Sequence, residues 1–260
     1  MQLKNVTYER RDRIALITIN RPDRLNAIDD DTSVELRQAF TAFRDDREQW
    51  VAILTGAGEK AFSAGADLVA MAKTMTAKGG FRMSVPFGGI TSDFRCWKPI
   101  IAAINGYCLA GGLELALACD IRIAAEHAQF GLPEVTRAII PGAGGTQRLP
   151  RVIPQAAAMQ LLLTGGRFDA AWALRFGLVT EVMSAGDLIG RALSIAEEIC
   201  QNGPLAVRAV KEAALRGLEG TLAQGLDLEA DLGRRVVRSE DAREGPRAFA
   251  EKRAPNYTGR

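Results

Sequence analysis

The chain has 260 residues, with 33 Lys and Arg against 31 Asp and Glu, and a formal net charge of +2. This nearly neutral balance argues against nucleic acid or a membrane surface as the main partner. Apolar residues make up 47% and charged residues 25%, which is typical of a soluble globular protein with a substantial core. The length fits one large domain, or one domain with a smaller appendage.

The four cysteines form no C-x-x-C pair, so we expect neither a disulfide framework nor a zinc site, and a reducing compartment fits best. The N-terminus has no basic-then-apolar signal pattern, and no apolar span reaches the length of a membrane helix. We therefore expect a cytoplasmic protein without membrane contact. The single histidine, His127, reads as an exposed turn residue, which disfavours Ser-His-Asp chemistry.

The first third of the chain alternates short apolar runs with glycine turns. Hydrophobic periodicity predicts a strand over 14–20, a turn over 21–27, an amphipathic helix over 30–47 and a strand over 51–55. Residues 61–68 then predict a short apolar piece, a glycine turn and a helix start with Asp67 near its N-terminus. Residues 74–92 carry several glycines and no clear period, which predicts a mobile loop or a frayed helix, a common place for a substrate-facing lid.

The middle of the chain predicts a strand over 99–104, a glycine turn, and a helix over 112–118 that is apolar on every side. Such a helix belongs in a core, yet Glu114 lies in its first turn. Glutamate is rarely buried without a partner or a purpose. We therefore treat Glu114 as a candidate functional residue.

The remaining segments become increasingly helical. We expect strands over 120–124, 128–131 and 178–182, a loop opening at Pro133, a helix starting within 141–148, and helices over 154–163, 169–176, 186–202, 204–218 and 220–238. The alternation of strands and helices stops near residue 195. This predicts an α/β core over 1–195 and a helical C-terminal region over 196–260.

Two glycine turns carry the first chemical hypothesis. Ser63–Asp67 and Ala110–Glu114 each place backbone N–H groups at a helix start after a strand. Two such donors aimed at one point would form an oxyanion hole, worth roughly 3 kcal/mol per donor. The alternative is that each turn is only a tight connection.

The second hypothesis concerns two carboxylates. Glu134 follows a Phe-Gly-Leu-Pro turn twenty residues after Glu114, and both would face one cleft if the intervening strands run back along the core. Two carboxylates in different environments can divide acid and base work. A helix-start or surface role for Glu134 is the competing interpretation.

These motifs together resemble the crotonase superfamily, and specifically its enoyl-CoA hydratase branch. The resemblance rests on IAAINGYCLAGGLELALACDIRIAAEHAQFGLPEV, PGAGGTQRLPR, FSAGADL, the RPDRLNA turn and SEDAREGPRAFAEKR. It covers nearly the whole chain, with its motifs in the family's order. It implies an α/β fold built as a spiral of ββα units, with a helical C-terminal region that mediates trimers, often paired into hexamers.

The resemblance also implies an activity. Family members hold a thioester enolate between two backbone amides, which match Ala66 and Gly111. Family hydratases add water syn across the 2-trans double bond of an enoyl-CoA. The residue matching Glu114 helps to activate the water, and the one matching Glu134 supplies the α-proton. The resemblance implies no metal and no cofactor beyond the coenzyme A of the substrate.

The CoA-binding positions follow from the same resemblance. Matching residues in the family contact CoA or lie near the substrate: Arg24, Leu25, Ala64, Ala66, Asp67, Leu68 and Gly142. Phe249 and Lys252 match residues that reach CoA bound to a neighbouring subunit, although an exposed helix end is the simpler interpretation of this pair. The chain departs from the family pattern at Ala110, where a third glycine is usual.

Two alternatives to a hydratase stay open. One is another crotonase reaction, such as enoyl-CoA isomerisation or dehydration of a specialised hydroxyacyl-CoA. The remote one is a non-catalytic RNA-binding role for Arg234, Arg235, Arg238 and Arg243, which alternate with acidic residues and so favour a solvated or subunit-facing surface.

Overall fold

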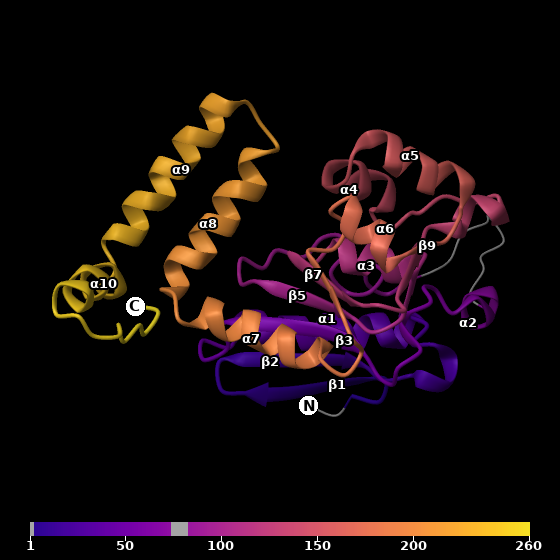
Figure 1. Ribbon diagram of the computed structural model, residues 1–260, viewed down its shortest axis with the longest axis horizontal. Coiled ribbons are helices and arrows are strands. Elements are labelled where there is room, and N and C mark those ends of the chain that lie inside the picture. Colours follow the sequence, from indigo (N-terminus) through magenta and orange to yellow (C-terminus); the bar gives the residue numbers. More distant parts are fainter. Residues whose placement is uncertain (1–2, 74–82) are drawn as a thin grey trace.

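The computed structural model describes residues 3–73 and 83–260 and shows a mixed α/β protein with an arm of helices at one end (Figure 1). The strands are β1 (Val6–Arg11), β2 (Ile14–Ile19), β3 (Val51–Gly56), β4 (Ala61–Ser63), β5 (Ile100–Ile104), β6 (Tyr107–Leu109), β7 (Ile121–Ala125), β8 (Gln129–Gly131), β9 (Phe168–Asp169) and β10 (Glu181–Met183). The helices are α1 (Asp30–Asp45), α2 (Leu68–Lys73), α3 (Gly111–Leu117), α4 (Gly145–Val152), α5 (Gln155–Thr164), α6 (Ala170–Arg175), α7 (Leu188–Cys200), α8 (Pro204–Gly217), α9 (Leu222–Val237) and α10 (Glu240–Ala250). Two 3₁₀ helices, η1 (Pro22–Arg24) and η2 (Pro133–Arg137), complete the order.

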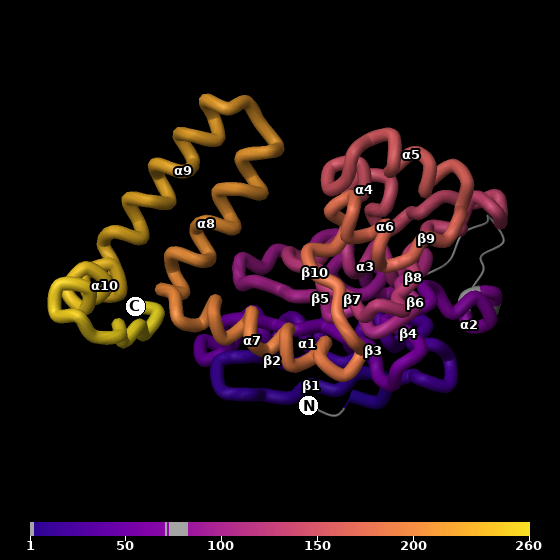
Figure 2. Tube along the Cα trace, viewed as in Figure 1, coloured from indigo at the N-terminus to yellow at the C-terminus, as the bar shows by residue number. Residues whose placement is uncertain are grey.

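The strands form two sheets, and the chain alternates between them from β3 to β8. The larger sheet has the order β1-β2-β3-β5-β7-β10, and the smaller one has the order β4-β6-β8-β9. The strands β3, β5 and β7 pair in parallel, and so do β4, β6 and β8. From β3 to β8, each successive pair of strands adds one strand to each sheet and is followed by a helix, so the predicted spiral of ββα units is confirmed (Figure 2).

The central strands are buried because helices cover both faces of the larger sheet. Alternate residues of β5 point to opposite sides, and they enter two separate apolar clusters. The first cluster holds Ile100 together with Phe40 and Phe43 of α1, whereas the second holds Ile101 together with Ile195 of α7. A parallel strand covered on both faces reads as a continuous apolar run, which explains why β3 and β5 are visible in the sequence.

Several elements differ from the predictions. Strand β1 was missed because it is an edge strand with mostly exposed, charged residues and so shows no apolar alternation. The predicted strand over 178–182 is shifted to β10, since Leu178 and Val179 pack in the core. Glu134 lies in η2, where a loop was expected. The first part of the predicted loop over 74–92 lies outside the described residues.

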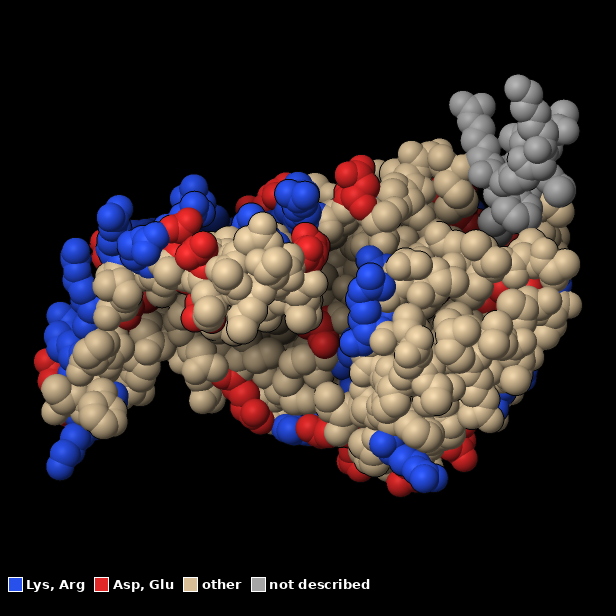
Figure 3. All heavy atoms as spheres, turned by 90° about the horizontal axis from the view of Figure 1, so that it is seen from above, with Lys and Arg blue, Asp and Glu red and all other residues tan. Residues whose placement is uncertain are grey.

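The C-terminal region, residues 196–260, contains helices and a short tail but no strand. Helices α8 and α9 pair with one another and extend away from the sheets, and α10 follows at the far end (Figure 1). Lys and Arg side chains gather toward that end, with Asp and Glu side chains among them (Figure 3). The predicted boundary at residue 195 falls inside α7, which packs on the larger sheet. No helix in residues 3–73 and 83–260 is long and apolar enough to cross a membrane.

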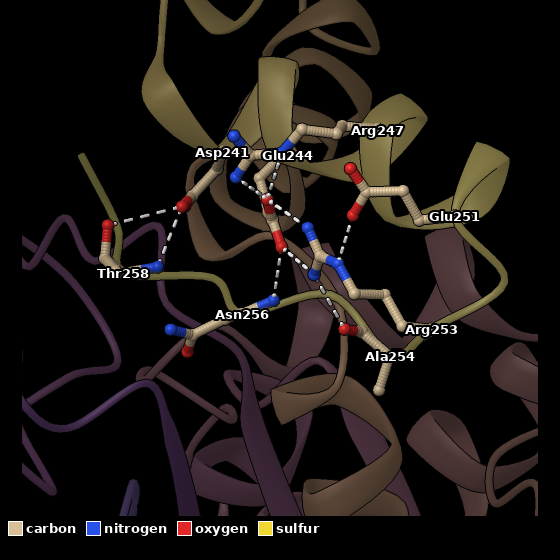
Figure 4. A network of polar contacts seen from close by, with 8 residues as sticks. All are labelled: Asp241, Glu244, Arg247, Glu251, Arg253, Ala254, Asn256 and Thr258. Carbon is tan, nitrogen blue, oxygen red and sulfur yellow. Dashed lines mark hydrogen bonds and ion pairs between the residues drawn. The ribbon is translucent and has the colours of Figure 1, made fainter.

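The segment after α10 folds back and fixes this helix. The Asp241 carboxylate accepts from the backbone amides of Thr258 and Gly259 at 2.7 and 2.8 Å, and Glu244 pairs with both Arg247 and Arg253 (Figure 4). Tyr257 packs against the second apolar cluster. The tail therefore ties α10 by polar contacts and reaches back to the sheet through Tyr257.

Candidate active site

The amide of Ala66 is freed for a ligand by the way residues 65–67 pair with Ile28. The Ile28 amide donates to the Gly65 carbonyl at 2.8 Å, and the Asp67 amide donates to the Ile28 carbonyl at 2.9 Å. In a parallel bridge of this kind, the residue between the two bonded ones directs its own N–H to the opposite side. The Ala66 N–H therefore points away from Ile28.

The amide of Gly111 is the second candidate donor. Gly111 is the first residue of α3, and the first N–H groups of a helix have no partner within the helix. Strands β4 and β6 are parallel neighbours, so the turns that follow them leave the same edge of the smaller sheet. The two predicted donors therefore lie on adjacent turns.

Gly65 brings these two turns into direct contact. Its φ of +94° suits glycine, and a Cβ at this position would lie 2.7 Å from the Ala110 Cβ and 3.0 Å from the Gly111 nitrogen. Any larger residue would push the turns apart. The close approach supports a shared oxyanion site over two unrelated connections.

Phe87 covers this site and was not predicted. A Cβ on Gly111 would collide with the Phe87 ring, so the ring lies directly against the backbone of the donor residue. A glycine at 111 is therefore needed for packing as well as for access. No local signal in the sequence marks Phe87, because it lies within the aperiodic stretch over 74–92.

Glu114 is buried in α3 with only 3% of its surface exposed, and one of its carboxylate oxygens is firmly held. Its Oε1 accepts from the backbone amides of Ala143 and Gly145, both at 2.7 Å. Burial raises the pKa of Glu114, while these two amides and the positive charge of Arg148 oppose that rise. The Oε2 atom has no hydrogen-bond partner among the described residues, which leaves it for substrate or water.

Glu134 lies close to Glu114 in a different environment. It is 8% exposed, and its Oε2 is buried without a hydrogen-bond partner among the described residues. Burial, with the neighbouring Glu114 charge as a smaller cause, raises the pKa of Glu134 to about 7. Glu114, whose carboxylate accepts two backbone hydrogen bonds, therefore lies beside Glu134, which favours its protonated form. Two carboxyl groups in such different environments can take separate acid and base roles.

Gly142 precedes the two amides that hold Glu114. It is exposed, and the nearest atom to a Cβ built there would be the Ile140 carbonyl oxygen at 3.9 Å. Open space over its backbone is compatible with the predicted position near substrate.

The predicted CoA positions gather along one rim next to the oxyanion turn. The Ala64 amide donates to the Leu25 carbonyl at 3.0 Å, which places the 21–27 turn beside β4. Arg24, Leu25 and Leu68 are exposed there. A cationic and apolar rim of this kind suits a nucleotide with a pantetheine arm.

Asp67 differs from its neighbours, because its carboxylate is already engaged. Its Oδ2 lies 3.0 Å from Arg21 Nη2, and its Oδ1 accepts from the Ala70 amide at 3.1 Å, capping α2. The same guanidinium nitrogen lies 3.0 Å from Asp29. Asp67 therefore fixes the backbone beside Ala66, and Arg21 is a second residue that sequence reasoning missed.

Phe249 and Lys252 are not brought to this site within one chain. Phe249 is 86% exposed on α10, which lies at the opposite end of the molecule from α2 (Figure 1). Any contact that they make with CoA must therefore involve a second copy of the chain.

No group of three His, Cys, Asp or Glu side chains suited to a metal ion occurs in the part of the chain that the structure describes. Cys96, Cys108 and Cys119 are buried, and burial raises the pKa of Cys119 to about 12. The buried thiols are therefore poor nucleophiles.

Comparisons with known proteins agree with this geometry. The sequence profile of the enoyl-CoA hydratase/isomerase family matches residues 9–260. The (E)-benzylidenesuccinyl-CoA hydratase of Thauera aromatica is 44% identical over 262 residues, covering 98% of this chain and 99% of the relative. The carnitinyl-CoA dehydratase of Salmonella arizonae is 45% identical over 247 residues, covering 94% of each chain.

A solved structure, that of an enoyl-CoA hydratase from Mycobacterium marinum, superposes with a TM-score of 0.91 at 40% identity and covers 98% of this chain and 99% of that one. Both curated relatives carry hydro-lyase names, so the predicted enzyme class is confirmed. With fold, motif order and profile in agreement, this chain belongs to the enoyl-CoA hydratase/isomerase family, as a hydro-lyase.

Proposed function

We propose that the protein adds water reversibly across the 2-trans double bond of an enoyl-CoA thioester. The observation that carries the proposal is the pair of buried glutamates, Glu114 and Glu134, with different protonation behaviour beside two adjacent amide donors. Such a site can supply a base, an acid and a place for negative charge without any cofactor. The coenzyme A belongs to the substrate.

In the proposed reaction the thioester oxygen lies between the N–H groups of Ala66 and Gly111. Charge moves onto this oxygen as water attacks the β-carbon, so the fixed dipoles stabilise the enolate more than the substrate. Glu114 accepts a proton from the attacking water through Oε2. Glu134 donates its proton to the α-carbon on the same face, which gives syn addition, and one proton passes back between the carboxylates to restore the site.

The proposed CoA-binding residues are Arg24, Leu25, Ala64, Leu68 and Gly142 of one subunit and Phe249 and Lys252 of a neighbour. Asp67 contributes through the backbone that it holds, because its carboxylate is paired with Arg21. We further propose that the protein assembles as a trimer or hexamer and acts in the cytoplasm. The apolar residues exposed on α8, on α9 and between them support assembly, and they include Val210, Leu218 and Leu222.

A second candidate is a related reaction on a specialised acyl group. The relatives are named for a benzylidenesuccinyl-CoA hydratase and a carnitinyl-CoA dehydratase, whose names give different acyl groups and opposite directions. Product analysis with 2-enoyl-CoA and 3-enoyl-CoA substrates would separate hydration from isomerisation. An RNA-binding role is disfavoured, because acidic side chains lie among the basic ones on the helical arm (Figure 3).

The proposal is tested with a panel of enoyl-CoA substrates, assayed by loss of the conjugated thioester absorbance. Glu114→Gln and Glu134→Gln should each lower kcat by about 10²- to 10⁴-fold, the usual contribution of a general acid or base. Both variants should still bind a saturated acyl-CoA. A variant that hydrates at the parent rate would remove that glutamate from the mechanism.

A further inference from the structure

Arg148 lies near the candidate base Glu114 and contacts two segments of the chain that are distant in sequence. It comes from the first turn of α4, and none of the predicted roles includes it. Its Nη2 donates to the Thr91 carbonyl at 2.7 Å, and its Nη1 donates to the Ala143 carbonyl at 3.3 Å. It therefore joins the segment before β5 to the turn that opens α4.

The contact with the Ala143 carbonyl links Arg148 to the candidate base. The turn at 143–145 holds Glu114 Oε1 through two amides, and the Arg148 guanidinium contacts the same turn through the Ala143 carbonyl. A side chain at Gly144 would collide with Arg148, so the guanidinium packs directly against the backbone. Gly144 also has a φ of +106°, a conformation suited to glycine. Arg148 therefore packs against the turn whose amides hold Glu114, which we call the Glu114 cradle (residues 143–145).

The contact with the Thr91 carbonyl links Arg148 to the oxyanion site. Thr91 is buried, and its Oγ1 donates to the Phe87 carbonyl at 2.6 Å. Phe87 in turn lies against Gly111, the candidate donor. A chain of direct contacts therefore runs from the Glu114 cradle through Arg148, Thr91 and Phe87 to the Gly111 amide.

We propose that Arg148 is a positioning residue that sets Glu114 and the Gly111 amide relative to one another. The proposal rests on the function proposed above, in which both groups act on one thioester. A fixed bridge would matter because displacement of a catalytic group by about 1 Å can cost about 10²-fold in rate. The positive charge of Arg148 would also lower the pKa of Glu114.

The effect of the Arg148 charge on the pKa of Glu114 can be measured, and a purely structural role for Arg148 would not produce it. Among the described residues, the charged groups facing Glu114 are Arg148 from α4 and Glu134 from η2. The Arg148 cation lowers the pKa of Glu114, against the effect of burial. Removing the cation therefore favours the protonated, inactive base, and the acid limb of the kcat/KM profile for hydration should move to higher pH.

The experiment compares Arg148→Met with Arg148→Lys and with Arg151→Met. Arg151 lies one turn further along α4, is exposed, and bonds only to Gln147 among the described residues, so it is a matched control. For Arg148→Met we expect kcat/KM to fall about 10- to 100-fold, with saturated acyl-CoA binding changed less than about threefold. Arg148→Lys should restore the position of the acid limb but only part of the rate, because lysine lacks the guanidinium fork. Arg151→Met should match the parent.

The carboxyl titration of Glu114, followed by NMR of ¹³C-labelled glutamate and assigned with Glu114→Gln, does not depend on turnover. It should move to higher pH in Arg148→Met and stay near the parent value in Arg148→Lys. An unchanged titration, or a rate loss with an unmoved acid limb, overturns the proposal for Arg148. Absence of hydration by the parent protein instead overturns the proposed function, while the titration still decides the role of Arg148.

Discussion

Glu134 is a carboxyl group that the fold buries without giving its Oε2 a partner among the described residues. Its pKa of about 7 means that the folded protein holds this proton more tightly than the unfolded chain does. At neutral pH the folded state must therefore either ionise a buried group or retain a proton that the unfolded chain would release. Stability is lost here so that an acid is available to the reaction.

Replacing Glu134 by Gln should therefore stabilise the protein at high pH while removing activity. Because the folded pKa is raised, the cost of Glu134 grows as pH rises from about 4.5 to about 7 and is complete above that range. Glu134→Gln should gain about 1–3 kcal/mol at pH 8 and much less at pH 5, measured by urea unfolding. An equal gain at both pH values would show that ionisation is not the cause.

Ala110 is a residue in a backbone conformation that favours glycine. It has φ 51° and ψ −130° at the start of α3, where it meets Gly65. Such conformations cost about 1–3 kcal/mol in a residue with a Cβ, whereas the greater entropy of glycine in the unfolded chain costs about 0.4–1 kcal/mol.

We expect Ala110→Gly to raise the free energy of unfolding by about 1 kcal/mol, because the relief of strain exceeds the entropy term. Ala118→Gly is the control, since Ala118 ends the same helix with φ −79° and ψ −11° and should lose stability. Thermal unfolding of both variants measures the effect. Similar losses in the two variants would contradict strain at Ala110.

The residues predicted at the site from sequence are those whose chemistry is visible locally. Glu114 is a charge in an apolar helix, and Ala66 and Gly111 lie in turns between a strand and a helix. Arg148 and Arg21 could not be found in this way, because their partners Thr91 and Asp67 are distant in sequence. The residues next to an arginine in the sequence also do not indicate whether it is buried. Phe87 was missed for the same reason.

The start of α3 depends on a contact between two elements. A Cβ on Gly112 would collide with the Ser63 carbonyl of β4, and a backbone atom cannot move aside as a side chain can. Gly190 in α7 offers the contrast, since nothing lies within 4 Å of a Cβ built there.

Gly112→Ala should therefore destabilise the protein by about 1–3 kcal/mol and lower hydration, because the turn after β4 and the start of α3 carry the two amide donors. Gly190→Ala should be neutral or stabilising by up to about 1 kcal/mol, since alanine favours the helix. Urea unfolding and kcat provide the measurements. Equal stability of the two variants would show that the turns can separate without cost.

Among the elements, sequence patterns revealed those buried on one or both faces. The strands β3 and β5 are continuous apolar runs, and α1 shows a clear apolar stripe. Strand β9 spans only Phe168–Asp169, too short to show any period. Helix α10 contains Gly245 and Pro246, which obscure it in the sequence, and tail contacts such as Asp241 with Thr258 hold it.

At the scale of the molecule, the helical arm leaves apolar side chains in solvent within one chain. Leu222 is 79% exposed at the start of α9, and Val210 and Leu218 are exposed on the paired helix region. If this surface is covered by other copies, Leu222→Lys should lower the molecular mass measured by light scattering, whereas Leu222→Met should leave it unchanged. An unchanged mass for the lysine variant would place the subunit contact elsewhere.

The alternation of the chain between two sheets has a consequence for folding. The Thr55 hydroxyl donates to the Ala103 carbonyl, 48 residues later in the sequence. Each added strand needs the edge of a strand from an earlier part of the chain to pair with. Loop closure on this scale is slow, so secondary structure should form well before long-range pairing is complete. Glu114 and the amides of Ala143 and Gly145 belong to different turns. In refolding from urea, hydration activity should therefore return later than the far-UV circular dichroism signal. Activity then reports when the long-range strand pairing is complete.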